Sequence, residues 1–194
     1  MGEILTIMVA AVLTENLVLT RFMGICPFMG VSERPSTAFG MGAAVTCVMT
    51  LSSAAAWAAH HFILAPFGLE YLRTVVFVLI IATLVGVMEM IMKKHFNALY
   101  KALGIFLPLV TTNCAVLGAA LIAADNEYSF VNSVIYGAFS AIGFTLAILI
   151  FAGVRERVRF ADPPAAFEGM PVALVAAGLL AMAFAGFYGI EIKL

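Results

Sequence analysis

Two cysteines stand where long apolar segments of the sequence are interrupted. Cys26 is followed directly by Pro27, and Cys114 comes six residues after Pro108. A proline inside a helix removes a backbone hydrogen bond and clashes with the preceding turn, so each cysteine is predicted to lie beside a break in a helix. If these helices cross a membrane, the freed backbone groups need protein partners, and the breaks should face the bundle interior or a cavity. Two thiols brought together at such breaks are well suited to hold a metal.

A simpler interpretation competes with this one. A single cysteine in a membrane helix usually acts as a small apolar residue. We adopt that interpretation for Cys47, which lies in the uninterrupted stretch "TCVMTL". For Cys26 and Cys114 the residues alone leave both interpretations open.

A second group of polar residues lies in the first apolar segment. Glu15 is about eleven residues into that segment, close to the middle of a bilayer at about 1.5 Å per residue, and Asn16 and Arg21 follow it. A carboxylate at this depth is a candidate for an ion or proton path, so Glu15 and Asn16 form a possible ion path. Alternatively, Glu15 has a structural role and bonds to the backbone of the break or stays protonated. Both alternatives remain open.

The composition indicates an integral membrane protein. The chain has 194 residues, of which 64% are hydrophobic and 11% charged, with a mean hydropathy of +1.11. Soluble domains carry about 25% charged residues. Six apolar segments are long enough to span a bilayer: about 4–31, 37–59, 71–92, 99–123, 129–153 and 170–190. We therefore expect an all-α, polytopic protein with six transmembrane helices in a single domain, residues 1–194, of which the first and fourth are broken.

The basic residues predict the orientation of these helices. Arg73 and Lys193 are the basic residues at the termini and in the connections after the second and fourth segments. Eight others lie in or beside the connections after the first, third and fifth segments: Arg21, Arg34, Lys93, Lys94, Lys101, Arg155, Arg157 and Arg159. By the positive-inside rule, these three connections are cytoplasmic, and both termini lie on the outer, periplasmic face.

Three helices in each half suggest an inverted repeat. If residues 1–95 and 96–194 are related, their odd number of helices requires the two copies to cross the membrane in opposite senses, as in many transporters. The stretch "CPFMG" at 26–30 is partly repeated as "CAVLG" at 114–118. Two broken helices that enter from opposite faces would bring Cys26 and Cys114 together near the middle of the bilayer.

Four stretches of the sequence resemble a known family. "RFMGICPFMGVS" (21–32), "YLRT" (71–74), "LGIFLPLVTTNCAVLGAAL" (103–121) and "VRERVRFADPPAAF" (154–167) are similar to the RnfA components of Rnf ion-translocating electron transport complexes. More distant relatives are the RnfE components and the paired D and E components of the sodium-translocating NADH:quinone reductase. The resemblance covers nearly the whole chain.

The resemblance implies a function that this chain cannot perform alone. It implies a subunit of a ferredoxin:NAD oxidoreductase in the bacterial cytoplasmic (inner) membrane, where electron transfer is coupled to Na⁺ or H⁺ translocation. An intramembrane [2Fe–2S] cluster is expected between this chain and an RnfE-like homologous subunit, with Cys26 and Cys114 as ligands. Such a cluster takes four thiolates, so the partner supplies two further cysteines. Other subunits are expected to carry the flavins, the NAD site and further iron–sulfur clusters; no nucleic-acid partner is expected.

The neighbours of the two cysteines are expected to tune such a cluster. Gly24, Ile25, Thr112 and Asn113 flank the cysteines, and freed backbone N–H groups there would donate to its sulfur atoms. A different function class also remains: a small inverted-repeat transporter whose broken helices bind a solute or cation and whose cysteines are incidental. The helix breaks alone support the electron-carrying function and the transporter function about equally.

Overall fold

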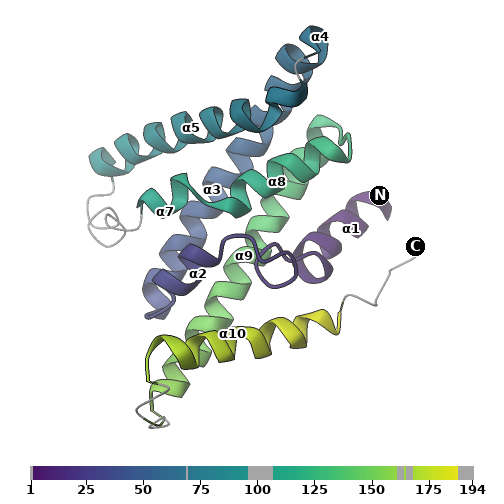
Figure 1. Ribbon diagram of the computed structural model, residues 1–194. Coiled ribbons are helices and arrows are strands. Elements are labelled where there is room, and N and C mark those ends of the chain that lie inside the picture. Colours follow the sequence, from purple (N-terminus) through teal and green to yellow (C-terminus); the bar gives the residue numbers. More distant parts are fainter. Residues whose placement is uncertain (1, 69, 96–106, 161–163, 165–167, 188–194) are drawn as a thin grey trace.

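Every secondary-structure element in the described part of the chain is helical (Figure 1). The computed structural model describes residues 2–68, 70–95, 107–160, 164 and 168–187. The α-helices are α1 (Gly2–Val9), α2 (Ile25–Val31), α3 (Pro35–Ala59), α4 (Ala65–Phe67), α5 (Arg73–His95), α7 (Leu107–Thr111), α8 (Cys114–Asp125), α9 (Phe130–Arg159) and α10 (Met170–Ala185). π-Helical turns extend α1 over Ala10–Thr14 and join α3 to α4 over His60–Leu64, and a 3-10 turn, Glu70–Leu72, precedes α5.

Several of these helices can cross a membrane. Four stretches among the described residues are long and apolar enough, namely Pro35–Leu64, Glu70–Lys94, Pro108–Asp125 and Phe130–Arg159, and Met170–Ala185 is a shorter apolar helix. The chain is therefore an all-α, polytopic membrane protein, as its composition indicates. The first apolar segment is divided into α1, its π-helical extension, a non-helical stretch over 15–24, and α2. Residues 99–106 and 188–190 of the expected fourth and sixth segments lie outside the described residues, and the inverted repeat of 1–95 and 96–194 stays a prediction.

The long helices α3 and α9 form the centre of the molecule. They pack closely because glycines face side chains of the other helix: a Cβ atom on Gly42 would overlap Thr145, and one on Gly137 would overlap Ser53. The hydroxyl groups of Thr46 and Thr145 are 3.4 Å apart across the same interface. Small residues let membrane helices approach to backbone distance, and dispersion contacts and hydrogen bonds then replace the hydrophobic driving force that lipid cannot supply.

The helix ends lie on two opposite sides of the molecule. In Figure 1, the start of α1, the α4–α5 and α8–α9 connections and the end of α10 lie on the right, while α2 leads into α3 and α9 ends on the left. The left side carries the basic ends of α5 and α9, including Lys93, Lys94 and Arg157. On the right, Arg73 forms an ion pair with Asp125. The described helices therefore alternate in direction between these two sides.

Candidate functional site

The first helix break covers residues 15–24. The π-helical turn closes with a hydrogen bond from the Glu15 N–H to the Ala10 carbonyl, 2.7 Å long. The chain then runs through turns without forming a helix until Gly24, which has φ +82° and immediately precedes α2. This left-handed backbone conformation is open to glycine without strain. Cys26 is the second residue of α2, so it lies directly after the break.

Asn16 holds this break together. Its side chain is fully buried, and its amide uses all four hydrogen-bonding positions, two donors and two acceptors. The oxygen accepts from the N–H groups of Val18 (3.1 Å) and Leu19 (3.4 Å), and the nitrogen donates to the carbonyls of Val12 (3.2 Å) and Gly143 (2.9 Å). Asn16 therefore satisfies the backbone that the broken helix exposes and ties it to α9. This arrangement favours a structural role for Asn16 over a place in an ion path.

The second break separates α7 from α8. Asn113 caps α8: its side-chain oxygen accepts from the Ala115 N–H at 3.0 Å, as expected of an N-cap residue. The hydroxyl of Thr112 donates to the Pro108 carbonyl at 3.0 Å, which closes the end of α7. Cys114 is the first residue of α8. Both cysteines therefore lie at the start of the helix that follows a break.

Pro27 does not interrupt the first helix, because it lies after the break. It is the third residue of α2, and the first turn of a helix has N–H groups without intrahelical partners, so a proline there removes no hydrogen bond. Pro108 lies within α7, and the residues that precede α7 are outside the described part of the chain. Among the described residues, the side chains of Asn16 and Asn113 and the left-handed Gly24 shape the two breaks.

The two breaks touch each other in the middle of the molecule. A Cβ atom on Gly24 would lie 3.0 Å from the Asn113 side-chain oxygen and 3.1 Å from both the Ala115 Cβ and the Phe144 ring. Phe144 is the fifteenth residue of the 30-residue α9, so this contact lies about halfway along a membrane-spanning helix. Cys26 and Cys114 are each within two residues of the contact. The structure thus brings together the two cysteine-bearing helix starts, although they are 88 residues apart in sequence.

The donor set of this region fits half of an iron–sulfur centre. The thiols of Cys26 and Cys114 are free and exposed. Within the described ranges there is no group of three His, Cys, Asp or Glu side chains that could hold a metal ion, so a cluster with four thiolate ligands needs a second protein. The side-chain nitrogen of Asn113 is buried beside Cys114 and has no hydrogen-bond partner among the described residues, which makes it a free N–H donor. Cys47 is also free and exposed, but it lies within the unbroken α3.

The other expected neighbours of the cysteines occupy different surroundings. Gly24 and Asn113 form the contact between the breaks, whereas Ile25 and Thr112 are exposed at the surface. The Thr112 hydroxyl already donates to a backbone carbonyl. Whether any of these four residues tunes a cluster stays a prediction.

The charged pair of the first break lies beside α10. Glu15 and Arg21 form an ion pair 3.2 Å long, with side chains 39% and 40% exposed, in a pocket whose other wall includes Gly178 and Met182 of α10. Arg21 thus lies inside the break rather than in a cytoplasmic connection, which corrects its use in the orientation count. The ion path through Glu15 stays a prediction.

Two residues of α9 that hold α2 in place, Phe151 and Arg155, were not identified from the sequence. The Phe151 ring stacks on the buried Phe28 of α2, with ring centroids 4.3 Å apart and planes 15° apart. Arg155 donates to the end of α2. From the sequence, Arg155 counted only as a cation for orientation; its spacing of four residues from Phe151, which puts both on one helix face, was the available signal.

Comparisons with known proteins place the chain among redox-complex subunits. A family model described as "Rnf-Nqr subunit, membrane protein" matches residues 4–191. The A component of the ion-translocating oxidoreductase complex of Syntrophotalea carbinolica is 53% identical over 190 residues, covering 98% of each chain. The A component of the Na⁺-translocating ferredoxin:NAD⁺ oxidoreductase complex of Acetobacterium woodii is 54% identical over 186 residues, which is 96% of this chain and 97% of that protein. The corresponding component of the ion-translocating oxidoreductase complex of Vibrio cholerae is 49% identical over 190 residues and also covers 98% of each chain.

Proposed function

Since this chain belongs to the Rnf-Nqr family of membrane subunits, we propose that it carries electrons across the membrane in a ferredoxin:NAD oxidoreductase complex of the Rnf type. In this role it holds half of a [2Fe–2S] cluster through Cys26 and Cys114. A homologous, RnfE-like subunit holds the other half. The chain is a non-autonomous part of a redox enzyme, and the flavins, the NAD site and further clusters belong to other subunits.

The contact between the two helix breaks carries this proposal. Each break is followed directly by a helix that begins at or next to an exposed cysteine, and Gly24 of one break touches Asn113 of the other. The two thiols are thereby presented to a partner from the middle of a membrane-spanning bundle. A cysteine that served only as a small apolar side chain would need neither the capped break nor its contact with the second break.

The depth of the site suits electron transfer across a bilayer. The hydrocarbon core is about 30 Å thick, so a centre in its middle lies roughly 15 Å from either edge and divides one long transfer into two shorter ones. When bound, the cluster accepts and donates a single electron. The side-chain nitrogen of Asn113 has no hydrogen-bond partner among the described residues, and its donation to sulfur would stabilise the reduced, more negative form.

The ion and the orientation follow from the same proposal. Electron transfer drives, or is driven by, the movement of Na⁺ or H⁺ across the bacterial cytoplasmic membrane. The basic ends of α5 and α9 face the cytoplasm, and the start of α1 and the end of α10 lie toward the periplasm. The ion pair between Arg73 and Asp125 supports this orientation because it neutralises an arginine on the proposed outer face.

Serine substitutions in the assembled complex test the proposal. We expect Cys26→Ser and Cys114→Ser each to abolish one [2Fe–2S] signal in electron paramagnetic resonance spectra and to remove about two iron atoms per complex. Cys47→Ser is the matched control, because it also removes an exposed thiol; we expect it to leave the signal and the iron content unchanged. Retention of the signal and the iron in both Cys26→Ser and Cys114→Ser would contradict the cluster assignment.

The same variants decide against or in favour of the transporter alternative. A small inverted-repeat transporter should move its solute or cation as an isolated chain, with both cysteines dispensable. The test uses the isolated chain reconstituted in vesicles. If the double variant Cys26→Ser/Cys114→Ser transports the solute or cation as fast as the unchanged chain, and the complex contains no cluster at this position, then the chain is a transporter.

A further inference from the structure

The half-helix that carries Cys26 cannot hold its own position. α2 has seven residues, which is about two turns, so few hydrogen bonds form within it. It follows a ten-residue non-helical stretch, residues 15–24, so no helix continues into it from the N-terminal side. The position of Cys26 therefore depends on contacts that α2 makes with the rest of the bundle.

One of these contacts is the aromatic stack at the start of α2. Phe28 is two residues after Cys26 and has a side chain that is buried against Phe151 of α9. A stacked pair of this kind adds stabilisation beyond the burial of its area. The stack fixes the side of α2 that faces α9, but a ring–ring contact permits sliding and rotation.

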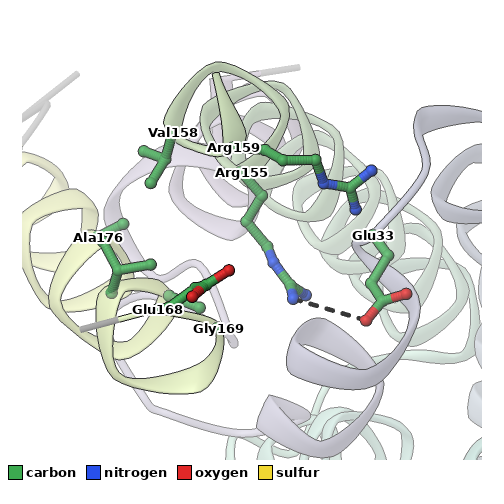
Figure 2. Close-up of a pocket in the computed structure, with 9 residues that line it drawn as sticks. Glu33, Arg155, Val158, Arg159, Glu168, Gly169 and Ala176 are labelled. Atoms are coloured by element: carbon green, nitrogen blue, oxygen red, sulfur yellow. Dashed lines mark ion pairs between the residues drawn. The ribbon is translucent and has the colours of Figure 1, made fainter. Parts of the chain in front are cut away.

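A second contact is made by Arg155 at the end of α2. One guanidinium nitrogen donates to the Met29 carbonyl and to the Ser32 hydroxyl, both at 2.9 Å. The last carbonyls of a helix have no intrahelical donors and form the negative end of its dipole, so a partly buried cation that donates there is stabilising. The second terminal nitrogen lies 3.8 Å from Glu33 (Figure 2). The Glu33 side chain is largely exposed, so the hydrogen bonds to α2 are the stronger part of this arrangement.

Arg155 and Phe151 act as one clamp. They are four residues apart on α9, and the Arg155 guanidinium carbon lies 5.9 Å from the centre of the Phe151 ring. The ring that stacks on Phe28 is thus also in contact with the cation that holds the end of α2. Two adjacent side chains of a rigid 30-residue helix define both the lateral position of α2 and its position along its axis.

We propose that Arg155 is a positioning residue for Cys26, acting through the C-terminal end of α2. This inference rests on the proposed function, because the position of Cys26 matters only if Cys26 is a ligand of the cluster. Arginine is required because its planar fork presents several donors at once, whereas lysine offers a single point charge.

Arg159 provides a matched control on the same helix face. It lies one turn after Arg155 and lines the same pocket, and its side chain extends away from Glu168 (Figure 2). The structure shows no hydrogen bond or ion pair between Arg159 and α2, which is described in full. Removing its charge should alter the pocket without loosening α2.

The test measures α2 directly by hydrogen exchange in the purified complex. In Arg155→Gln we expect the amides of residues 28–31 to exchange about tenfold or more faster, since a hydrogen bond to a charged group contributes about 1.5–3 kcal/mol. Arg155→Lys should give a smaller increase, and Arg159→Gln none. Unchanged exchange in Arg155→Gln, or an equal increase in Arg159→Gln, would overturn the proposal.

A second measurement separates this inference from the proposed function. In Arg155→Gln we expect the cluster's electron paramagnetic resonance spectrum and midpoint potential to shift, with Arg155→Lys partly restoring them and Arg159→Gln matching the unchanged complex. Faster exchange in α2 with an unchanged spectrum and potential would overturn the role of Arg155 in positioning Cys26. Absence of any cluster signal in the unchanged complex would instead refute the proposed function, while the exchange data would still decide whether Arg155 holds α2.

Discussion

The substitution Gly24→Ala tests whether the contact between the two helix breaks is as tight as the structure shows. Gly24 has φ +82°, and a Cβ atom there would lie 3.0–3.1 Å from the Asn113 oxygen, the Ala115 Cβ and the Phe144 ring. The first neighbour caps α8 and the third lies on the central helix α9, so neither can move without disturbing another element.

Two costs determine the size of the effect. An alanine in the left-handed conformation costs about 1–2 kcal/mol relative to glycine. Crowding a methyl group into a close-packed site typically costs a further 1–3 kcal/mol. We therefore expect Gly24→Ala to lower the free energy of unfolding by about 2–5 kcal/mol.

The assay is unfolding of the purified chain in mixed detergent micelles with increasing denaturing detergent, followed by far-ultraviolet circular dichroism. Gly30→Ala is the matched control, because Gly30 lies within α2 and its added Cβ would meet only the Leu109 side chain, at an ordinary 3.7 Å. Alanine is favoured over glycine inside a helix by about 1 kcal/mol, so this variant should be as stable as the unchanged chain or slightly more stable. If Gly24→Ala unfolds at the same point as Gly30→Ala, the two breaks do not touch in the way described and the reasoning is refuted.

Three further substitutions give sharp expectations. Asn16→Ala should cost about 2–4 kcal/mol in the same unfolding assay, because it leaves two buried backbone N–H groups without partners; a loss below about 1 kcal/mol would contradict the role of Asn16 in closing the break. Asn113→Ala should change the cluster's midpoint potential by about 40 mV, the equivalent of one hydrogen bond of about 1 kcal/mol in a one-electron step, and an unchanged potential in redox titrations would reject Asn113 as a donor to the cluster. Glu15→Gln should change the unfolding free energy by less than about 1 kcal/mol, because its ion pair is about 40% exposed, and a larger loss would show that the pair stabilises the break.

The residues of the proposed site divide into those that the sequence singles out and those that it does not. Cys26, Cys114 and Asn113 are identified because their residue types, next to interrupted apolar segments, narrow the possible chemistry. Phe151 and Arg155 are missed because an aromatic residue and a terminal arginine are ordinary in a membrane helix. Their importance comes from a partner more than 120 residues away, since Arg155 bonds to Met29 across a separation of 126 residues.

Pro27 shows the limit of predicting helix breaks from local sequence. A proline in an apolar segment predicts a helix break when the start of the helix is unknown. Pro27 instead lies in the first turn of α2, where the missing N–H has no consequence. The position of a helix start depends on which backbone groups find partners elsewhere, and in the first break these include the Asn16 amide, which donates to the carbonyl of Gly143.

By itself, the sequence determined that the chain is helical, crosses a membrane several times and carries its cysteines at interrupted segments, because hydropathy, segment length and residue type are properties of short stretches of chain. The tertiary structure alone decided that Gly24 meets Asn113 and that Asn16 reaches α9 over 127 residues. The physical reason is that, within a bilayer, a broken helix must satisfy its free backbone groups with whatever protein atoms packing brings near, and packing is a property of the whole bundle.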